Sequence, residues 1–173
     1  MLEEFETAYP KSDYLTNFYD AMAVNYFQKN KFKTLLDFFT ANASKFSTYR
    51  FYSISSKMLE DNKYPRIALD IANLGVERSR QELDDPTGQQ PKYQSTEEWK
   101  EDRQSMLGMN LYASAKALYT LGKVEEAEAP LSEAKDLTKG QDEDVNQLYT
   151  KILVANGNTD AAKKEIEGYI KQG

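Results

Sequence analysis

Four helix-ending residues constrain the fold of this chain more than any other feature of its sequence. Each is Asn or Gly, and these two residue types most easily adopt the left-handed backbone conformation that ends a helix. The four segments are Asn30-Lys31-Phe32, Asn62-Lys63-Tyr64, Gly122-Lys123-Val124 and Gly157-Asn158-Thr159. When the sequence is aligned on these four residues, the flanking segments share one register without a gap. The recurrence predicts four pairs of helices, each pair joined by a short turn.

The aligned positions also indicate how the helices of a pair contact each other. Seven residues before each stop the side chain is small or compact (Ala23, Ser55, Ala115, Thr150), and four before it is large (Tyr26, Met58, Leu118, Leu153). Large or small apolar residues recur five and nine positions after each stop (Leu35, Ile67, Ala127 and Ala162; Phe39, Ile71, Leu131 and Ile166). Small residues allow two helices to approach closely, and large ones fill the space between them.

Apolar residues recur at helical spacing along almost the whole chain, and no strand-length stretch alternates strictly between apolar and polar residues. Residues suited to begin a helix, Ser12 with Asp13, Ser47 with Thr48, and Ser95 with Thr96, precede three of the apolar periods. We therefore predict an all-α fold of about eight helices without a sheet. The expected ranges are 12–29, 31–43, 48–61, 64–83, 96–121, 124–138, 142–155 and 159–172.

One segment interrupts this pattern. The run from Asp84 to Gln94 contains two Pro, one Gly and three Gln, which predicts a loop over residues 84–95. The loop separates two less regular helix pairs in residues 1–83 from two regular pairs in residues 96–173. Because 173 residues is an ordinary length for one domain, we expect the two parts to form a single continuous domain.

The repeated pattern resembles the tetratricopeptide repeat, and the resemblance extends over most of residues 12–172. It is strongest in residues 111–137, LYASAKALYTLGKVEEAEAPLSEAKDL, where Gly122, Ala127, Leu131 and Ala134 match the pattern of that family. The first two units depart from it, with Asn in place of Gly and with Leu35 or Ile67 in place of Ala. The resemblance implies a right-handed superhelix of antiparallel helix pairs. It also implies a concave surface, formed by the first helix of each pair, that binds proteins or peptides.

Candidate ligand-binding positions follow from the same resemblance. Ten and six residues before each stop, the family exposes side chains on its concave surface. The candidates at these positions are Tyr52, Tyr112, Lys116 and Lys151. They offer aromatic faces and two cations to an extended ligand with acidic or carboxylate groups. Asp20 and Val24 stand where repeats that bind chaperone tails carry Lys and Asn, so that class of peptide is disfavoured.

The composition excludes most catalytic chemistry. Cysteine and histidine are absent, which removes thiol and imidazole catalysis, disulfides and zinc sites built from Cys and His. The sequence contains no calcium-binding or phosphate-binding loop, and its carboxylate pairs are typical of solvated helix faces. We therefore predict no catalytic residue, cofactor or metal site, and a function other than that of an enzyme.

Charge and hydropathy narrow the class of partner. The net charge is −6, and no cluster of basic residues stands out, which disfavours nucleic acid. No apolar run reaches the length needed to cross a membrane, so membrane insertion is not expected. The expected partner is a protein or a peptide, and a homodimer is compatible with the sequence.

An alternative function concerns residues 95–131, STEEWKEDRQSMLGMNLYASAKALYTLGKVEEAEAPL. This stretch is similar to the repeat segment that precedes a thioredoxin-like domain in some bacterial envelope proteins. Under this alternative the chain is an N-terminal accessory module of a disulfide-exchange protein, and the catalytic domain lies outside residues 1–173. The compartment would then be the bacterial periplasm, and otherwise the cytoplasm.

Overall fold

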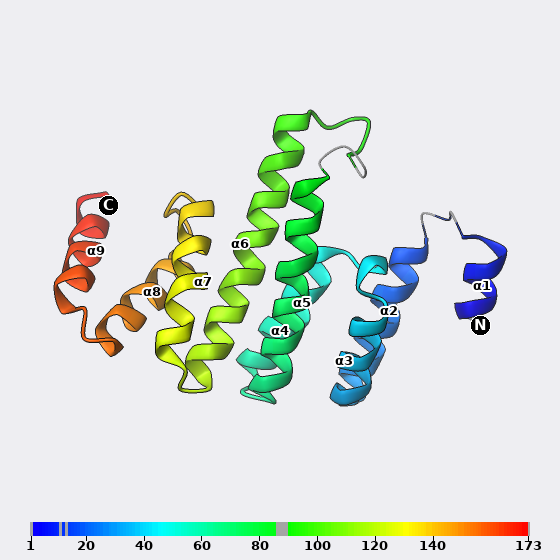
Figure 1. The fold of residues 1–173 in the computed structure, drawn as a ribbon, viewed down its shortest axis with the longest axis horizontal. Helices are drawn as coiled ribbons and strands as arrows, with labels where there is room; N and C mark the ends of the chain where they lie inside the picture. The colour runs from blue at the N-terminus through cyan, green and yellow to red at the C-terminus, as the bar shows by residue number, and fades with distance from the viewer. Residues whose placement is uncertain (1, 11, 13, 86–89, 173) are drawn as a thin grey trace.

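The computed structural model describes residues 2–10, 12, 14–85 and 90–172, and this part of the chain is helical with no strand. The helices are α1 (Leu2–Ala8), α2 (Leu15–Gln28), α3 (Phe32–Ala41), α4 (Thr48–Glu60), α5 (Pro65–Asp84), α6 (Thr96–Thr120), α7 (Val124–Leu137), α8 (Glu143–Ala155) and α9 (Thr159–Gln172), with a short 3-10 helix, η1 (Ala43–Lys45). The all-α prediction is confirmed. Figure 1 shows these helices arranged in one row, with α1 at one end and α9 at the other.

Eight of these α-helices correspond to the predicted ranges, with ends that differ by three residues at most. The predicted number is too low by one, because α1 is a further helix. It packs on α2 through aromatic side chains, with the ring centroids of Phe5 and Phe18 5.0 Å apart. The hydroxyl of Tyr19 also donates a hydrogen bond to Glu6 Oε2 at 2.7 Å. A helix of seven residues is too short to show a clear apolar period in sequence.

The four predicted stops all have the left-handed backbone conformation. Their φ angles are 56° at Asn30, 50° at Asn62, 77° at Gly122 and 79° at Gly157. In each turn, the amide of the residue after the stop donates to the carbonyl five residues earlier. These bonds are Lys31 N to Tyr26 O, Lys63 N to Met58 O, Lys123 N to Leu118 O and Asn158 N to Leu153 O, at 2.8–2.9 Å. The predicted register is therefore present in the backbone as four copies of one Schellman turn.

The apolar core extends from α2 to α8, and one part of it lies where α4, α5 and α6 meet. Phe51 on α4 and Asn110 on α6 are fully buried there, and both lie next to Gly75 of α5. The Nδ2 group of Asn110 donates to the Oγ of Ser79 and to the carbonyl of Thr48, both at 3.3 Å. The amide of Asn110 thus ties α6 to α5 and to the start of α4.

The broadest contact between two helices is the one between α5 and α6, on either side of the predicted loop. Glu82 of α5, whose side chain is only 5% exposed, pairs with Arg78 at 3.3 Å and with Arg103 of α6 at 2.9 Å. The Arg103 guanidinium also lies over the ring of Trp99, 4.1 Å from its centroid. The side chain of Trp99 is itself buried.

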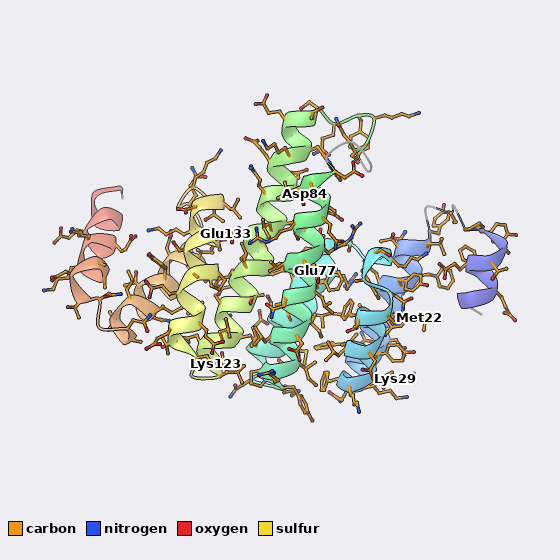
Figure 2. The ribbon with its side chains drawn as sticks, in the orientation of Figure 1. Met22, Lys29, Glu77, Asp84, Lys123 and Glu133 are labelled. Atoms are coloured by element: carbon orange, nitrogen blue, oxygen red, sulfur yellow. The ribbon has the colours of Figure 1, made fainter. Side chains whose placement is uncertain are left out.

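Between α5 and α6, residues 85 and 90–95 of the described chain lie outside any helix. Helix α5 ends at Asp84, and Ser95 begins α6, its Oγ accepting a hydrogen bond from the amide of Glu98 at 3.2 Å. Residues 86–89 lie outside the described part of the chain. A further ion pair connects the two parts, because Nη2 of Arg80 on α5 lies 2.7 Å from Oε2 of Glu133 on α7. Figure 2 labels Glu133 on α7, and Glu77 and Asp84 on α5.

Candidate functional site

The predicted ligand-binding residues lie on α4, α6 and α8, the first helices of the second, third and fourth pairs. Helix α6 contacts both α4 and α8. Tyr52 and Tyr112 occupy equivalent positions on α4 and α6, ten residues before Asn62 and Gly122, and both side chains are half-buried. Lys116 follows Tyr112 by one turn of α6, and Lys151 occupies the equivalent position on α8. We call the surface on which these four residues are predicted to lie the α4–α6–α8 face.

The hydroxyl groups of Tyr52 and Tyr112 are both affected by the acidic residues at the start of α8. Burial is the main cause that raises the pKa of the Tyr52 hydroxyl, and the carboxylates of Asp142 and Asp144 raise it further. Burial likewise raises the pKa of the Tyr112 hydroxyl well above its usual range, and Asp144, Tyr52 and Asp142 add to the effect. Asp142 and Asp144 thus oppose the ionisation of both phenols, and Tyr52 also opposes the ionisation of Tyr112. At neutral pH both tyrosines are uncharged hydrogen-bonding groups.

One cation of this face, Lys116, interacts with one of its aromatic rings, that of Tyr112. The Nζ atom of Lys116 lies 5.5 Å from the centroid of the Tyr112 ring, within the range of a cation–π interaction. Lys151 is exposed on α8. Within the part of the chain that the structure describes, neither lysine has an Asp or Glu within ion-pair distance.

The equivalent position in the first helix pair has a different role. Asp20 of α2 accepts a hydrogen bond from the Oγ of Ser47 at 3.0 Å, and it forms an ion pair with Arg50 of α4 at 3.4 Å. Burial raises the pKa of the Asp20 carboxyl, and the positive charge of Arg50 opposes that shift. Asp20 thus connects α2 to α4, which accounts for an acidic residue where a peptide-tail binder would carry a cation.

The carboxylates of Asp142 and Asp144 are the part of this face that sequence reasoning missed. Asp142, the first residue of the predicted range 142–155, immediately precedes α8, and its Oδ1 accepts a hydrogen bond from the amide of Val145 at 3.0 Å. The carboxylates of Asp142 and Asp144 lie near Tyr112 because of the way α8 packs on α6. The shared register of the two helices is the signal that could have revealed it, because Asp144 stands one turn before the residue equivalent to Tyr112.

The structure also contains a cleft that the sequence did not indicate. It has a volume of about 830 Å³ and lies between the end of α7, the start of α8 and α9. Its lining carries charges of both signs, and two of them, Lys135 and Glu165, form an ion pair across it. The amide of Asn146 donates to the carbonyl of Gly140 at 2.7 Å in the same wall. The mixed and mutually paired lining does not favour one class of ligand.

In the described part of the chain, no group of acidic side chains is arranged to hold a metal ion. None of the described helices is long and apolar enough to cross a membrane. No family model matches this sequence, and neither the curated proteins nor the solved structures compared with it include a match.

Proposed function

We propose that this protein is a non-catalytic scaffold whose α4–α6–α8 face binds an extended segment of a partner protein. In this proposal the helix pairs stack as tetratricopeptide repeats do, in a right-handed superhelix, and the first helices form its concave side. The observation that supports the proposal is the joint position of Tyr52, Tyr112 and Lys116 on neighbouring helices. These side chains are half-buried, and α4 contacts α6.

The side chains of this face are better suited to bind a peptide than to bind a small molecule or to catalyse a reaction. Tyrosine rings that are already half-buried lose little conformational freedom when a ligand covers them, and they provide both apolar area and a hydroxyl group. Lys116 and Lys151 occupy equivalent positions on adjacent helices, so two carboxylate groups of an extended ligand can each meet a cation. The ligand class that fits these residues is a peptide segment with acidic side chains.

Selection from a random library of 12-residue peptides displayed on phage tests this proposal. The native protein is expected to enrich a set of peptides that carry Asp or Glu. The double variant K116E/K151E is expected to bind these peptides at least about tenfold more weakly, because it places two negative charges where the ligand's carboxylates dock. The melting temperature is expected to change little, because surface substitutions usually cost less than about 0.5 kcal/mol.

The matched control is K100E/K163E, which makes the same change of charge at two exposed lysines of α6 and α9. It is expected to retain the affinity of the native protein within about twofold, because its charges lie away from the ligand. The proposal is wrong if no peptide is enriched. It is equally wrong if both double variants weaken binding to the same extent, since net charge alone would then explain the effect.

A further inference from the structure

A groove lies between α3 and α5, the second helices of the first and second pairs, which contact each other. We call it the α3–α5 groove. It has a volume of about 520 Å³, and each of the two helices contributes four residues to its lining. None of the residues of the α4–α6–α8 face lines it. An inference about this groove therefore does not depend on the proposed function.

The floor of the α3–α5 groove is apolar. Leu36 of α3 and Leu74 of α5 are half-buried and pack against the apolar core, and both also line the groove. Asp37 of α3 and Glu77 of α5 line it as well, but their side chains are exposed. The half-buried leucines thus form the floor, and the exposed acids form the rim.

The rim of the groove carries negative charge that the protein leaves largely unpaired. Among the described residues, neither Asp37 nor Glu77 has a Lys or Arg within ion-pair distance. Asp70, the third acid of the lining, lies 3.9 Å from Nε of Arg66, at the outer limit of an ion pair. A basic ligand that covers the apolar floor would give these carboxylates a partner, which an acidic or uncharged ligand would not.

The arrangement of floor and rim favours a helical ligand. Acids lie on both walls of the groove, Asp37 on α3, and Asp70 and Glu77 on α5. Successive side chains of an extended strand point to opposite faces, so the neighbours of a residue that contacts the floor would point to solvent. An amphipathic helix instead has polar residues on both flanks of its apolar stripe. A helix can therefore cover the leucines and present basic residues to both walls.

We propose that the α3–α5 groove is a docking site for a basic amphipathic helix of a partner protein. The apolar stripe of this helix covers Leu36 and Leu74, and its Lys or Arg side chains pair with the acids of the rim. Asp70 and Glu77 are seven residues apart, about 10.5 Å along α5. Two basic residues seven positions apart in a ligand helix aligned with α5 span the same distance.

Three fluorescein-labelled peptides with blocked ends test the proposal by fluorescence anisotropy at about 0.1 M salt. The basic helical probe consists of two copies of Leu-Lys-Lys-Leu-Leu-Lys-Ala, and the acidic helical probe has Glu in place of each Lys. The alternating probe, two copies of Leu-Lys-Leu-Lys-Leu-Lys-Ala, has the composition of the basic helical probe but the apolar period of a strand. The basic helical probe is expected to bind at least about tenfold more tightly than either of the others.

The first deciding variant is D37N/E77Q, which removes two charges of the rim and nearly preserves the shape of both side chains. It is expected to bind the basic helical probe about fivefold more weakly. The matched control, D160N/E167Q, makes the same change at two exposed acids of α9, which lies at the end of the row of helices away from α3 (Figure 1). It should retain the native affinity within about twofold. Equal losses in the two variants would show that net charge alone binds the probe, and the proposal would then be wrong.

A second pair of variants tests the groove itself. Thr40 lines the groove, and its Oγ1 donates a hydrogen bond to the carbonyl of Leu36 at 2.9 Å. Thr120 of α6 is likewise exposed, and its Oγ1 donates to the carbonyl of Lys116 at 2.8 Å. T40R places a long cationic side chain in the groove, so the basic helical probe should lose at least about tenfold in affinity, whereas T120R should retain it within about twofold.

Three results would overturn the proposal. The basic helical probe would fail to bind the native protein, or T40R would bind it as tightly as T120R does. The third is an alternating probe that binds as tightly as the basic helical probe, which would show that the ligand need not be a helix.

Discussion

The hydroxyl group of Tyr112 is held where its ionisation is opposed. Burial is the main cause, and the carboxylates at the start of α8 add to it, so the pKa of Tyr112 in the folded protein is above its usual range. In the unfolded chain a tyrosine titrates near 10. Below that pH both states hold the proton. Above it the unfolded state loses the proton first, so the free energy of unfolding must fall as the pH rises.

We expect the substitution Tyr112→Phe to reduce this loss of stability, because phenylalanine has no proton to release. Urea denaturation at pH values between about 9 and 11 measures it, over the window that begins at the usual tyrosine pKa. The free energy of unfolding should decrease less steeply with pH in the variant than in the native protein. Tyr93→Phe, at a side chain that is 91% exposed, is the control and should follow the native protein. Equal slopes in Tyr112→Phe and the native protein would show that Tyr112 does not contribute.

At the scale of the helices, Gly75 determines how closely α5 approaches its neighbours. A Cβ atom at this position would lie 2.1 Å from Oδ1 of Asn110 on α6 and 2.7 Å from Cβ of Phe51 on α4. Neither neighbour can move easily, because both are fully buried. The absence of a side chain at Gly75 therefore allows three helices to pack around one point.

The substitution Gly75→Ala is expected to lower the free energy of unfolding by about 1–3 kcal/mol, the usual cost of extra volume in a packed core. Denaturation by urea measures the change. Gly168→Ala is the matched control, since Gly168 is also inside a helix and a Cβ there would meet no atom within 4 Å. It should raise stability by up to about 1 kcal/mol, because alanine favours the helical state. A Gly75→Ala variant as stable as the control would mean that the helices do not pack as described.

The ends of the helices show how far the sequence determines this structure. The C-terminal ends at Asn62 and Gly122 were predictable, because few residue types adopt a positive φ. The N-terminal ends of the helices were harder to predict. Ser95 and Asp142 bond the backbone as expected, yet Ser47 begins α4 without such a bond. The Oγ of Ser47 instead donates to Asp20 on another helix, a contact that a local pattern does not contain.

The same distinction applies to the candidate site. The register of the repeats predicts that Tyr52 and Tyr112 are equivalent, and in the folded protein Tyr52 is one of the groups that raise the pKa of Tyr112. The proximity of Asp144 to Tyr112 could not be predicted with the same ease, because it depends on the packing of α8 against α6. Local conformation could therefore be predicted from the sequence. The electrostatic environment of the site could be described only once the arrangement of the helices was known.

At the scale of the whole molecule, the two parts on either side of the 84–95 segment share the broadest contact in the protein. Helix α5 packs against α6 along its length, and the buried Glu82 pairs with Arg103 across that contact. Arg80 also reaches Glu133 of α7. Separating the two parts would expose to water the surfaces of α5 and α6 that contact each other. It would also leave the buried charge of Glu82 without Arg103, its partner on α6, and an unpaired buried charge is costly in free energy. These contacts favour the prediction that the loop connects two parts of one folding unit.

We therefore expect residues 1–173 to unfold in one cooperative transition. Trp99 is the single tryptophan, and it is buried beside Arg103 at the start of α6, so its fluorescence reports on the contact between α5 and α6. Far-ultraviolet circular dichroism reports on all helices. The two signals should give the same urea midpoint, which is the test of two-state behaviour. Separate midpoints, with the helices of one part surviving after the fluorescence change is complete, would show that the chain consists of two independent domains.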